Sequence, residues 1–453
     1  MSYTPNTEAD RQAMLATIGV NSIDDLFQDI PSTARIQSLD FPAALSEMDA
    51  VRLMRTLSSR NADLSRYSSF LGAGAYRHFI PSVVGHIIGR SEFYTAYTPY
   101  QPEVSQGTLQ TIYEYQSMLS ELTGMDIANA SMYDGASALG EAVIMAAAAT
   151  HRTKTLIANT IHPHFREVAK TYAEGPGLRI ENVGPEFGQS FDGRLTADAA
   201  SAALDSETAA LVVQQPNFLG SIEDLRSLAD AAHAAGALLI VVVNPIALGL
   251  LESPGAAGAD IVVGEGQPLG IPLAYGGPWL GIFAATQKLV RQIPGRIVGQ
   301  TTDLDGRRGF VLTLQTREQH IRRERATSNI CTNVALCALA STVYLSTIGK
   351  VGLRQIANLC LQKAHYAADA IAKIPGFSIP NRAPFFHEFV VRSPIPVAKL
   401  KSILHSSGIL PGYQLGNAYD DLAGCILVCT TEMNTKDEID RLVTALATAS
   451  AAA

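Results

Sequence analysis

The sequence predicts an α/β protein built on a mostly parallel sheet with helices on both faces. Between residues 105 and 330, short apolar runs alternate with helical stretches of about 10 to 15 residues, which is the pattern of βαβ units. Runs such as Leu238–Val243 are continuously apolar, as expected for strands buried on both faces. Apolar residues make up 47% of the 453 residues and charged residues 17%, which suits a chain with much internal surface. We expect a helical and irregular N-terminal arm (1–104), a large α/β domain (105–330), and connecting helices with a small α+β domain (331–453).

The N-terminal arm should contain short helices and one long irregular segment. Helical pieces are expected at Ala13–Ile18 and Ile23–Phe27, and Ser46–Leu57 begins with a Ser followed three residues later by an Asp, as in a capping box. Leu71–Gly107 is rich in glycine, proline and aromatic residues, so we expect it to be irregular apart from one short helix, Pro81–Ile88. Loops of this length in compact chains are typically functional or wrap a partner.

Apolar periodicity predicts the elements of the two following domains. An amphipathic helix over Ser105–Leu122, ended by Gly124, opens the large domain. Its predicted strands are Ile127–Met132, Thr155–Ala158, Leu178–Val183, Ala210–Gln214, Leu238–Val243 and Ile261–Val263, and its predicted helices are Leu139–Ala149, Pro163–Tyr172, Thr196–Leu204 and Glu223–Ala235. The C-terminal region should hold helices from Glu318 to Lys373 (among them Ala335–Thr347), strands Phe385–Val391 and Cys425–Cys429, and helices Val397–Ser406 and Lys436–Ala449.

The composition excludes several classes of protein. A net charge of −8 argues against nucleic acid or an anionic membrane as the main partner. The five cysteines form no paired framework and the first residues lack a secretory signal, so we expect a cytoplasmic protein. The longest apolar run, Ala234–Leu251, contains Asn244 and Pro245 and fits a buried strand and turn better than a membrane span. No metal is expected, because His162 and His164 lack further ligands at metal-binding spacing.

The stretch Ile240–Ala285 has the layout of a pyridoxal phosphate (PLP) site. A buried strand ends at Asn244, a second strand covers Ile261–Val263, and a loop with a Gly-Gly-Pro turn follows. A PLP enzyme has an Asp at the end of the first strand and a Lys in the loop after the second. Asn244 and Gln267 stand at those positions, so the layout is present without the two residues that do the cofactor's chemistry.

Three other features each admit two explanations. The turn Asp134–Ser137, with backbone N–H groups and the Ser137 hydroxyl at a helix start, is either an anion site or an ordinary capped helix. His162 follows a strand end, where an imidazole either stacks on a cofactor ring or simply packs and caps. Arg317–Arg325 (REQHIRRER) is either a solvated, ion-paired helix face or a docking patch for an acidic partner.

Four longer matches exceed what composition can indicate. The segment Ala96–Gly107 (AYTPYQPEVSQG) resembles a hallmark of glycine dehydrogenase (decarboxylating), the P-protein of the glycine cleavage system. The turn Met132–Ala138, the YGGP motif at Tyr275–Pro278 and the run Arg322–Asn333 (RRERATSNICTN) are similar to that family as well. The resemblance is to the N-terminal half of the protein, which two-gene versions make as a separate α subunit.

The resemblance implies a PLP-dependent transferase fold of type I and a glycine-decarboxylating activity that passes the aminomethyl group to the lipoyl arm of H-protein. Gln267 stands where that chemistry needs a Lys, and an amide forms no Schiff base. Asn244 lacks the charge that the pyridine nitrogen requires, and Lys154 and Lys288 are poor substitutes. PLP is therefore expected on a sister β subunit, in an α2β2 heterotetramer, with Ser137 and His162 as vestiges of a site.

The resemblance also gives the aromatic segment a role. In fold type I proteins each chain lends residues to its partner's site, so the segment is expected to line the sister subunit's glycine and PLP pocket through Tyr94, Tyr97, Thr98, Tyr100, Gln101 and Glu103. The alternative is an interface brace without substrate contact. Three functions therefore compete: a required half of a heteromeric decarboxylase, a structural or regulatory pseudoenzyme, and a self-sufficient PLP enzyme that uses another lysine.

Overall fold

The computed structural model describes residues 6–36, 38–326, 328–330 and 334–451. The chain forms two compact units, Met1–Ala62 and Asp63–Ala453. The first holds α1 (Glu8–Ile18), two 3-10 turns and α2 (Glu47–Ser58). Thr7 and Ser46 cap the two helices by accepting the N–H of the residue three positions on. Among the described residues of this unit only Leu15 is buried, so its helices leave most of their apolar side chains uncovered.

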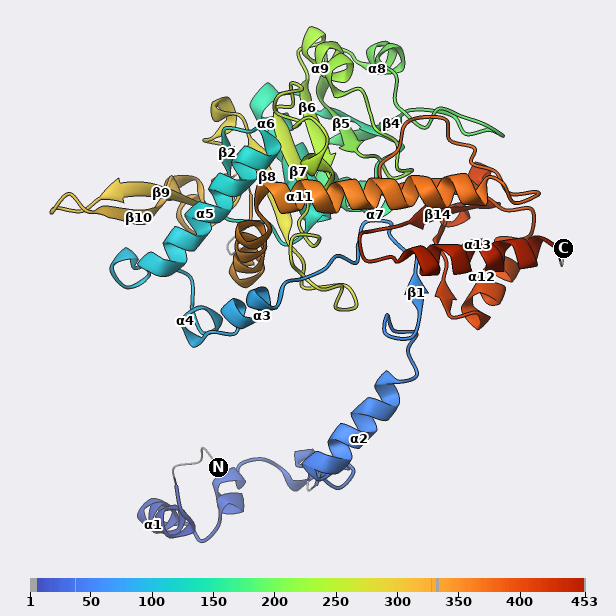
Figure 1. Ribbon diagram of the computed structural model, residues 1–453. Helices are drawn as coiled ribbons and strands as arrows, with labels where there is room; N and C mark the ends of the chain where they lie inside the picture. Colours follow the sequence, from blue (N-terminus) through green and yellow to red (C-terminus); the bar gives the residue numbers. More distant parts are fainter. Residues whose placement is uncertain (1–5, 37, 327, 331–333, 452–453) are drawn as a thin grey trace. The chain divides into compact units, whose positions relative to one another are not determined.

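The second unit is centred on a seven-stranded sheet with the order β2-β8-β7-β6-β5-β3-β4 (Figure 1). Its strands are β2 (Ile127–Ala128), β3 (Lys154–Ala158), β4 (Arg179–Val183), β5 (Thr208–Gln215), β6 (Leu238–Val243), β7 (Ile261–Glu265) and β8 (Gly281–Ala285). The strands from β7 to β4 are parallel, while β8 runs antiparallel to β7 and β2 antiparallel to β8. Every residue of β3, β7 and β8 is buried, which means that both faces of the sheet are covered.

Helices from the whole length of the second unit provide that cover. They are α5 (Gln106–Thr123), α6 (Gly135–Thr150), α7 (Pro163–Glu174), α8 (Ala197–Ala203), α9 (Leu225–Ala234) and α11 (Ala335–Ile371), with α3 (Ser82–Ile88) and α4 (Ser91–Tyr94) before them. The helix α6 packs on β5 to β8 and on α7, while α9 packs on β6. The apolar core is therefore continuous from α5 to α11 around the sheet.

The C-terminal part forms a second apolar core of its own. Strands β11 (Glu388–Arg392), β14 (Cys425–Cys429) and β13 (Tyr413–Gln414) make an antiparallel sheet under α12 (Val397–Ser406) and α13 (Lys436–Ala451). The short strand β12 (Ile409–Leu410) pairs in parallel with β1 (Ser68–Ser69). Residues from both ends of the second unit therefore build this core.

The helix α11 is long and apolar enough to cross a membrane by length and composition alone. Gly349, with φ 59°, interrupts it, and it packs against α3, α5 and α13, as a core helix does. The apolar run Ala234–Leu251 is divided between the end of α9, the strand β6 and a 3-10 turn at Ala247–Gly249, as its strand-and-turn explanation requires.

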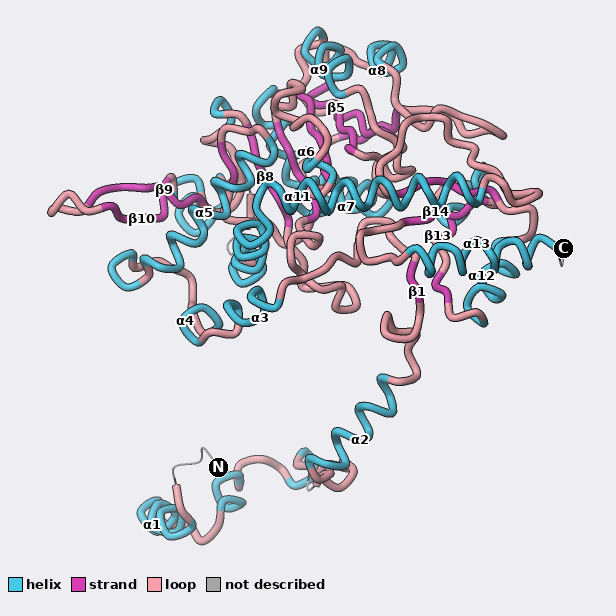
Figure 2. The backbone as a smooth tube through the Cα atoms, in the orientation of Figure 1, coloured by secondary structure: helices cyan, strands magenta, loops and turns pink. Residues whose placement is uncertain are grey.

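The expected strand Ile127–Met132 is formed only over Ile127–Ala128, and two further elements were not among those expected. The apolar piece Gly281–Ala285 is the strand β8, and Gly281 is required there because a Cβ would lie 2.4 Å from the Asp134 carbonyl oxygen. A hairpin of β9 (Ile297–Thr302) and β10 (Arg308–Thr313), which was not expected, projects from the body of the unit (Figure 2). Its turn contains Asp305-Gly306, a dipeptide typical of hairpins, so the signal was present in the sequence.

Candidate functional site

The carboxyl ends of the parallel strands β5, β6 and β7 meet at one edge of the main sheet, where ligands bind in open α/β folds. Asn244 follows β6, Glu265 ends β7, and Gln267 lies two residues further on. The helix α6 begins beside them, because a Cβ on Gly135 would lie 2.8 Å from the Glu265 nitrogen. The positions expected to hold a cofactor are thus brought together.

The N-terminus of α6 is occupied by the chain's own carboxylate. The Gly135 N–H donates to Glu265 Oε2 over 2.9 Å, and the N–H groups of Gln267 and Leu280 donate to Oε1 over 2.9 and 3.0 Å. Ser137 and Asp134 cap the same helix reciprocally, with a Ser137 N–H to Asp134 Oδ1 distance of 2.7 Å. Glu265 is only 7% exposed, and burial raises its pKa to about 7 against the effect of the three N–H donors.

The Gln267 side chain both accepts a hydrogen bond from the backbone of Tyr76 and donates one to it. Its Oε1 accepts the Tyr76 N–H over 2.9 Å, and its Nε2 donates to the Tyr76 carbonyl over 3.0 Å and to the Ile271 carbonyl over 2.8 Å. The side chain is 2% exposed. The Gln267 amide therefore both donates to and accepts from the backbone of a residue 191 positions earlier in the chain.

Asn244 points its amide at a histidine. Asn244 Nδ2 donates to His387 Nε2 over 3.0 Å, while Asn244 Oδ1 accepts the Ile246 N–H. Burial lowers the pKa of His387 to about 3, so this ring is neutral and its Nε2 is an acceptor. The ring of Tyr76 packs on His387 with centroids 4.7 Å apart.

His162 contacts backbone where a cofactor ring was expected to stack. Its Nε2 donates to the Ala73 carbonyl over 2.8 Å, and its Nδ1 accepts the His164 N–H. A Cβ on Gly74 would lie 2.9 Å from the His162 ring, which shows how closely the backbone covers it. Burial lowers the pKa of His162 to about 4, consistent with this neutral arrangement.

The covering backbone, residues 71–79, is held from the C-terminal part as well. Glu388 accepts the Ala73 N–H over 2.7 Å and the Tyr76 hydroxyl over 2.7 Å, and the Phe79 N–H donates to Glu432 over 2.7 Å. Burial raises the pKa of Glu388 to about 7. We call residues 71–79 the covering segment.

The residues of this site do not fit PLP. A carboxylate occupies the helix N-terminus where the phosphate would bind, an amide replaces the lysine, and the covering segment lies on His162. Neither alternative lysine helps. Lys154 begins β3 and pairs with Asp205 over 2.7 Å, and Lys288 follows β8, so both lie at the opposite edge of the sheet from Gln267.

The aromatic segment between α4 and α5 has the opposite character, because it is open to solvent. The side chain of Tyr97 is 82% exposed and that of Tyr94 69%, and both line a hollow of about 270 Å³ with Thr98 and Leu336. Gln101 and Glu103 are also exposed, and within the described part of the chain their side chains have no hydrogen-bond or ion-pair partner. These groups are free to meet another molecule.

Tyr100 is the member of this segment that is anchored. Arg296 Nη2 donates to the Tyr100 hydroxyl over 3.0 Å, and the guanidinium lies 5.3 Å from the ring centroid. Arg296 is 2% exposed and lies 4.0 Å from Glu318, which in turn is 3.5 Å from His320. The structure thereby joins the aromatic segment to the arginine-rich stretch.

That stretch is not the continuous ion-paired helix that one explanation required. Only Gln319–Arg322 is α-helical, with a 3-10 turn at Arg323–Arg325, and Glu318 is buried instead of solvated. Arg322 and Arg323 are exposed, and Arg325 lies a distant 4.0 Å from Glu324. The docking explanation stays open, and the ion-paired helix is wrong because Glu318 turns inward to Arg296.

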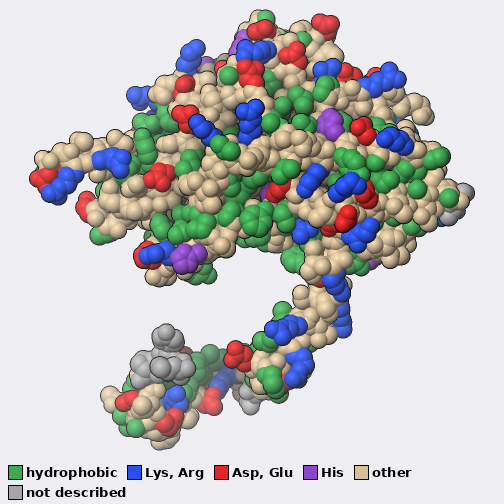
Figure 3. All heavy atoms as spheres, in the orientation of Figure 1, with side chains coloured by type: hydrophobic (Ala, Val, Ile, Leu, Met, Phe, Trp, Pro, Cys, Tyr) green, Lys and Arg blue, Asp and Glu red, His purple; other side chains and the backbone are tan. Residues whose placement is uncertain are grey.

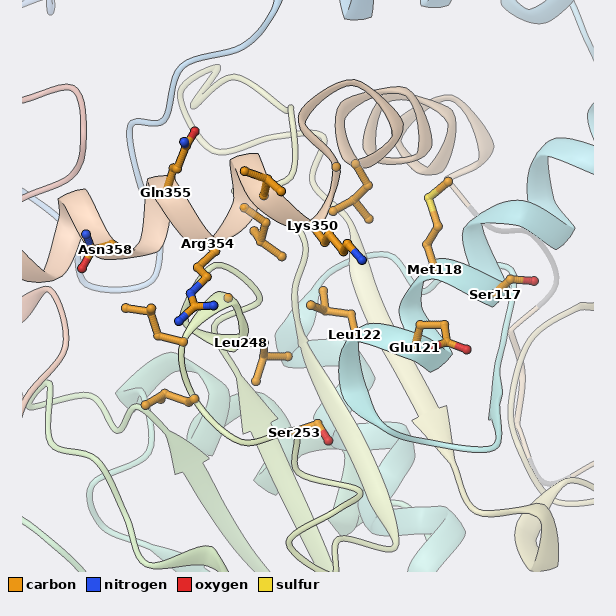
Figure 4. Close-up of a pocket in the computed structure, with 17 residues that line it drawn as sticks. Ser117, Met118, Glu121, Leu122, Leu248, Ser253, Lys350, Arg354, Gln355 and Asn358 are labelled. Carbon is orange, nitrogen blue, oxygen red and sulfur yellow. The ribbon is translucent and has the colours of Figure 1, made fainter.

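Two further features lie outside the strand-end site. A pocket of about 1240 Å³ lies between α5, the connection after β6 and α11, where Lys350 and Arg354 extend towards Leu122 and Leu248 (Figure 4). His78, Cys360 and Glu432 come close enough to suggest a metal site. His78 Nδ1, however, lies 2.7 Å from Glu432 Oε2, a direct hydrogen bond, and we assign no ion there.

The fold is that of the PLP-dependent transferases of type I, with the strand-end site closed. A sphingosine-1-phosphate lyase from Burkholderia pseudomallei shares it with a TM-score of 0.66 at 15% identity, over 93% of this chain and 94% of that chain. This likeness concerns the fold alone.

Closer relatives define the family. The glycine cleavage system P-protein family matches residues 1–446. A probable glycine dehydrogenase (decarboxylating) subunit 1 from Desulforamulus reducens is 55% identical over 98% of this chain and 99% of its own length. A crystal structure of a glycine decarboxylase (P-protein) in inhibitor-bound form matches with a TM-score of 0.90 at 41% identity, over 99% of this chain and 100% of that one. The chain belongs to the glycine cleavage system P-protein family, which confirms the resemblance and the predicted fold class.

Several residues of the site were not predicted from the sequence: Glu265, Tyr76, His387, Glu388 and Arg296. Glu265 carried a usable signal, because a carboxylate at the end of an otherwise apolar strand must find buried partners. The other four depend on contacts between distant parts of the chain, such as the bond from Tyr76 to Glu388 across 312 positions. No local pattern reports such contacts.

Proposed function

We propose that this chain is the cofactor-free but catalytically required subunit of a glycine decarboxylase and works with a PLP-bearing sister subunit. The pair decarboxylates glycine and transfers the aminomethyl group to the lipoyl arm of H-protein. The observation that carries this proposal is the closed site, in which Glu265, Gln267 and the covering segment take up the positions that PLP would need. The proposal assigns the cofactor to the sister chain and places the two chains in a cytoplasmic α2β2 assembly.

The exposed apolar surface supports the proposal that this chain works as part of a complex. Hydrophobic side chains reach the surface in broad areas of the unit Asp63–Ala453 (Figure 3), and the unit Met1–Ala62 buries little of its own apolar surface. Extensive exposed apolar surface is typical of protein–protein interfaces. An enzyme of this fold type shares its active site across a subunit interface, so this surface suits contact with a sister subunit.

The chain's share in catalysis is assigned to the aromatic segment. Tyr94 and Tyr97 offer phenol hydroxyls, and Gln101 offers an amide, which donate hydrogen bonds to the carboxylate of glycine and to negative charge that develops on its carbon. Glu103 offers a carboxylate for the ammonium group. None of these groups is a strong nucleophile at neutral pH, so they bind and orient glycine without competing in the reaction.

The test is reconstitution with the sister subunit, glycine and lipoylated H-protein, followed by mass spectrometry of the aminomethylated lipoyl arm. Tyr97→Phe and Glu103→Gln should lower kcat/KM by about 100- to 1000-fold, as loss of one stabilising group does in other enzymes. Tyr366→Phe, an exposed tyrosine on α11, is the matched control and should leave the rate unchanged. Normal turnover in both segment variants would support the interface brace and the pseudoenzyme role instead.

The self-sufficient alternative has a separate test. The chain alone, mixed with PLP and treated with borohydride, should show no imine absorbance and no covalent adduct by mass spectrometry. An adduct on Lys154 or Lys288 would establish the alternative. The geometry opposes it, since Lys154 is 5% exposed and paired with Asp205.

A further inference from the structure

More than the two substituted positions, Asn244 and Gln267, stands against cofactor binding at this site. Asn244 and Gln267 account for the missing charge and the missing amine, but neither of them blocks a phosphate or a ring. The blocking groups are Glu265 and the covering segment, which occupy the helix N-terminus and the face of His162. Glu265 does not depend on either substituted side chain, whereas the covering segment is held by Gln267 at Tyr76 and, separately, by Glu388 and Glu432.

We propose that the chain fills a former cofactor site with its own groups, Glu265 being the internal anion that replaces the phosphate and the covering segment replacing the ring. This inference rests on the proposed function only in taking the site to be descended from a cofactor site. It concerns what the isolated chain binds, so its failure is distinguishable from failure of the catalytic proposal.

The geometry at Glu265 supports the assignment of an internal anion. The carboxylate collects N–H donors from three different places: the first turn of α6, the loop after β7, and the residue before β8. The partial positive charge of a 16-residue helix points at it through Gly135. Convergent backbone N–H groups at a helix N-terminus are the arrangement that binds phosphate in other proteins.

The covering segment is held in place by hydrogen bonds along its length. Ala73, Tyr76 and Phe79 each donate a backbone N–H to a buried or half-buried side chain, namely Glu388, Gln267 and Glu432. The Tyr76 ring packs on His387, and the Tyr76 hydroxyl reaches Glu388. A flat ring cannot enter without breaking these bonds.

The first experiment is chemical rescue by inorganic phosphate. Glu265→Ala removes the carboxylate and leaves the three N–H donors, so phosphate should bind and raise the Tm of this variant by about 2 °C or more at saturating concentration. The wild-type chain should show only the smaller, general stabilisation that an excluded salt such as phosphate gives to folded proteins. Glu141→Ala is the matched control, because Glu141 is a buried carboxylate on the same helix that lies away from its N-terminus. A phosphate effect that is absent from Glu265→Ala, or equal in all three proteins, overturns the assignment.

The second experiment keeps Glu265 and restores the two missing residues. The double variant Asn244→Asp/Gln267→Lys, shown to be folded by circular dichroism, is titrated with PLP and reduced with borohydride. No visible imine band and no adduct are expected, because Glu265 still occupies the N-terminus of α6, and Glu388 and Glu432 still hold the covering segment after the Gln267 bonds are lost. A reducible band in this variant overturns the proposal, and this result stands even if Glu265→Ala does not fold.

Discussion

Arg296 holds Tyr100 in place from inside the protein: its Nη2 donates to the phenol oxygen over 3.0 Å, and the guanidinium lies 5.3 Å from the ring centroid. Tyr100 is 47% exposed, whereas Arg296 is 2% exposed. A buried cation thus orients one exposed ring of the aromatic segment, while Tyr94 and Tyr97 have no such anchor among the residues that the structure describes.

Removing the Tyr100 hydroxyl should destabilise the chain. Tyr100→Phe leaves the buried Arg296 without this acceptor, and a lost bond to a charged group costs about 1.5–3 kcal/mol in free energy of unfolding. Urea unfolding of the isolated chain measures it. Tyr97→Phe is the control and should change stability by less than about 0.5 kcal/mol, because that ring is 82% exposed. Equal stability of the two variants would show that the Arg296–Tyr100 bond contributes nothing.

Glu388 should make stability depend on pH. Burial raises its pKa from 4.5 to about 7, so the folded state binds the proton more tightly than the unfolded state. Its contribution is full below pH 4.5 and is lost as pH rises through about 7, with an upper bound of about 3 kcal/mol. Glu388→Gln mimics the protonated acid and should gain stability relative to wild type between pH 5 and about pH 8. A pH-independent difference between the two proteins would contradict this assignment.

Two glycines should respond in opposite ways to alanine. At Gly281 a Cβ would lie 2.4 Å from the Asp134 carbonyl oxygen and 2.5 Å from the Met132 Cβ, so Gly281→Ala should destabilise strongly, by about 3 kcal/mol or more. Gly85 lies in α3, where an added Cβ would meet no atom within 4 Å, and Gly85→Ala should stabilise by about 0.5–1 kcal/mol through helix propensity. Thermal unfolding of both variants decides the matter.

Substituting the exposed residues Arg322 and Arg323 tests whether they bind an acidic partner or are simply solvated. Arg322→Glu/Arg323→Glu should raise the KM for lipoylated H-protein in the reconstituted enzyme, with an effect that weakens at high salt because screening acts on exposed charges. Lys399→Glu/Lys401→Glu, two exposed cations on α12, is the charge-matched control. If both double variants have the same KM, the docking explanation fails.

The sequence predicted the buried strands well because burial on both faces leaves a continuous apolar run. The bounds of β6 and β14 were predicted to the residue, as were those of the amphipathic helix α12. The hairpin of β9 and β10 was missed because its outer residues are polar and solvated, so the apolar alternation is weak. Periodicity reports burial, and where burial is partial it reports little.

The candidate site was only partly predictable. Asn244 and Gln267 were identified by what they lack, since their positions follow from the order of strands and loops. What they bind, namely His387 and Tyr76, comes from segments more than 140 positions away in the chain. The covering segment appeared in the sequence only as an irregular, glycine-rich stretch, because its order depends on side chains of other elements.

The covering segment also links the two apolar cores mechanically. On one side it is tied to Gln267 and His162 of the main sheet, and on the other to Glu388 and Glu432 of the C-terminal part. Opening either core therefore breaks bonds to the other, and residues 63–453 should melt in a single cooperative transition. The amide hydrogens of Ala73, Tyr76 and Phe79 should accordingly exchange with deuterium only through global unfolding, as slowly as those of the central strands.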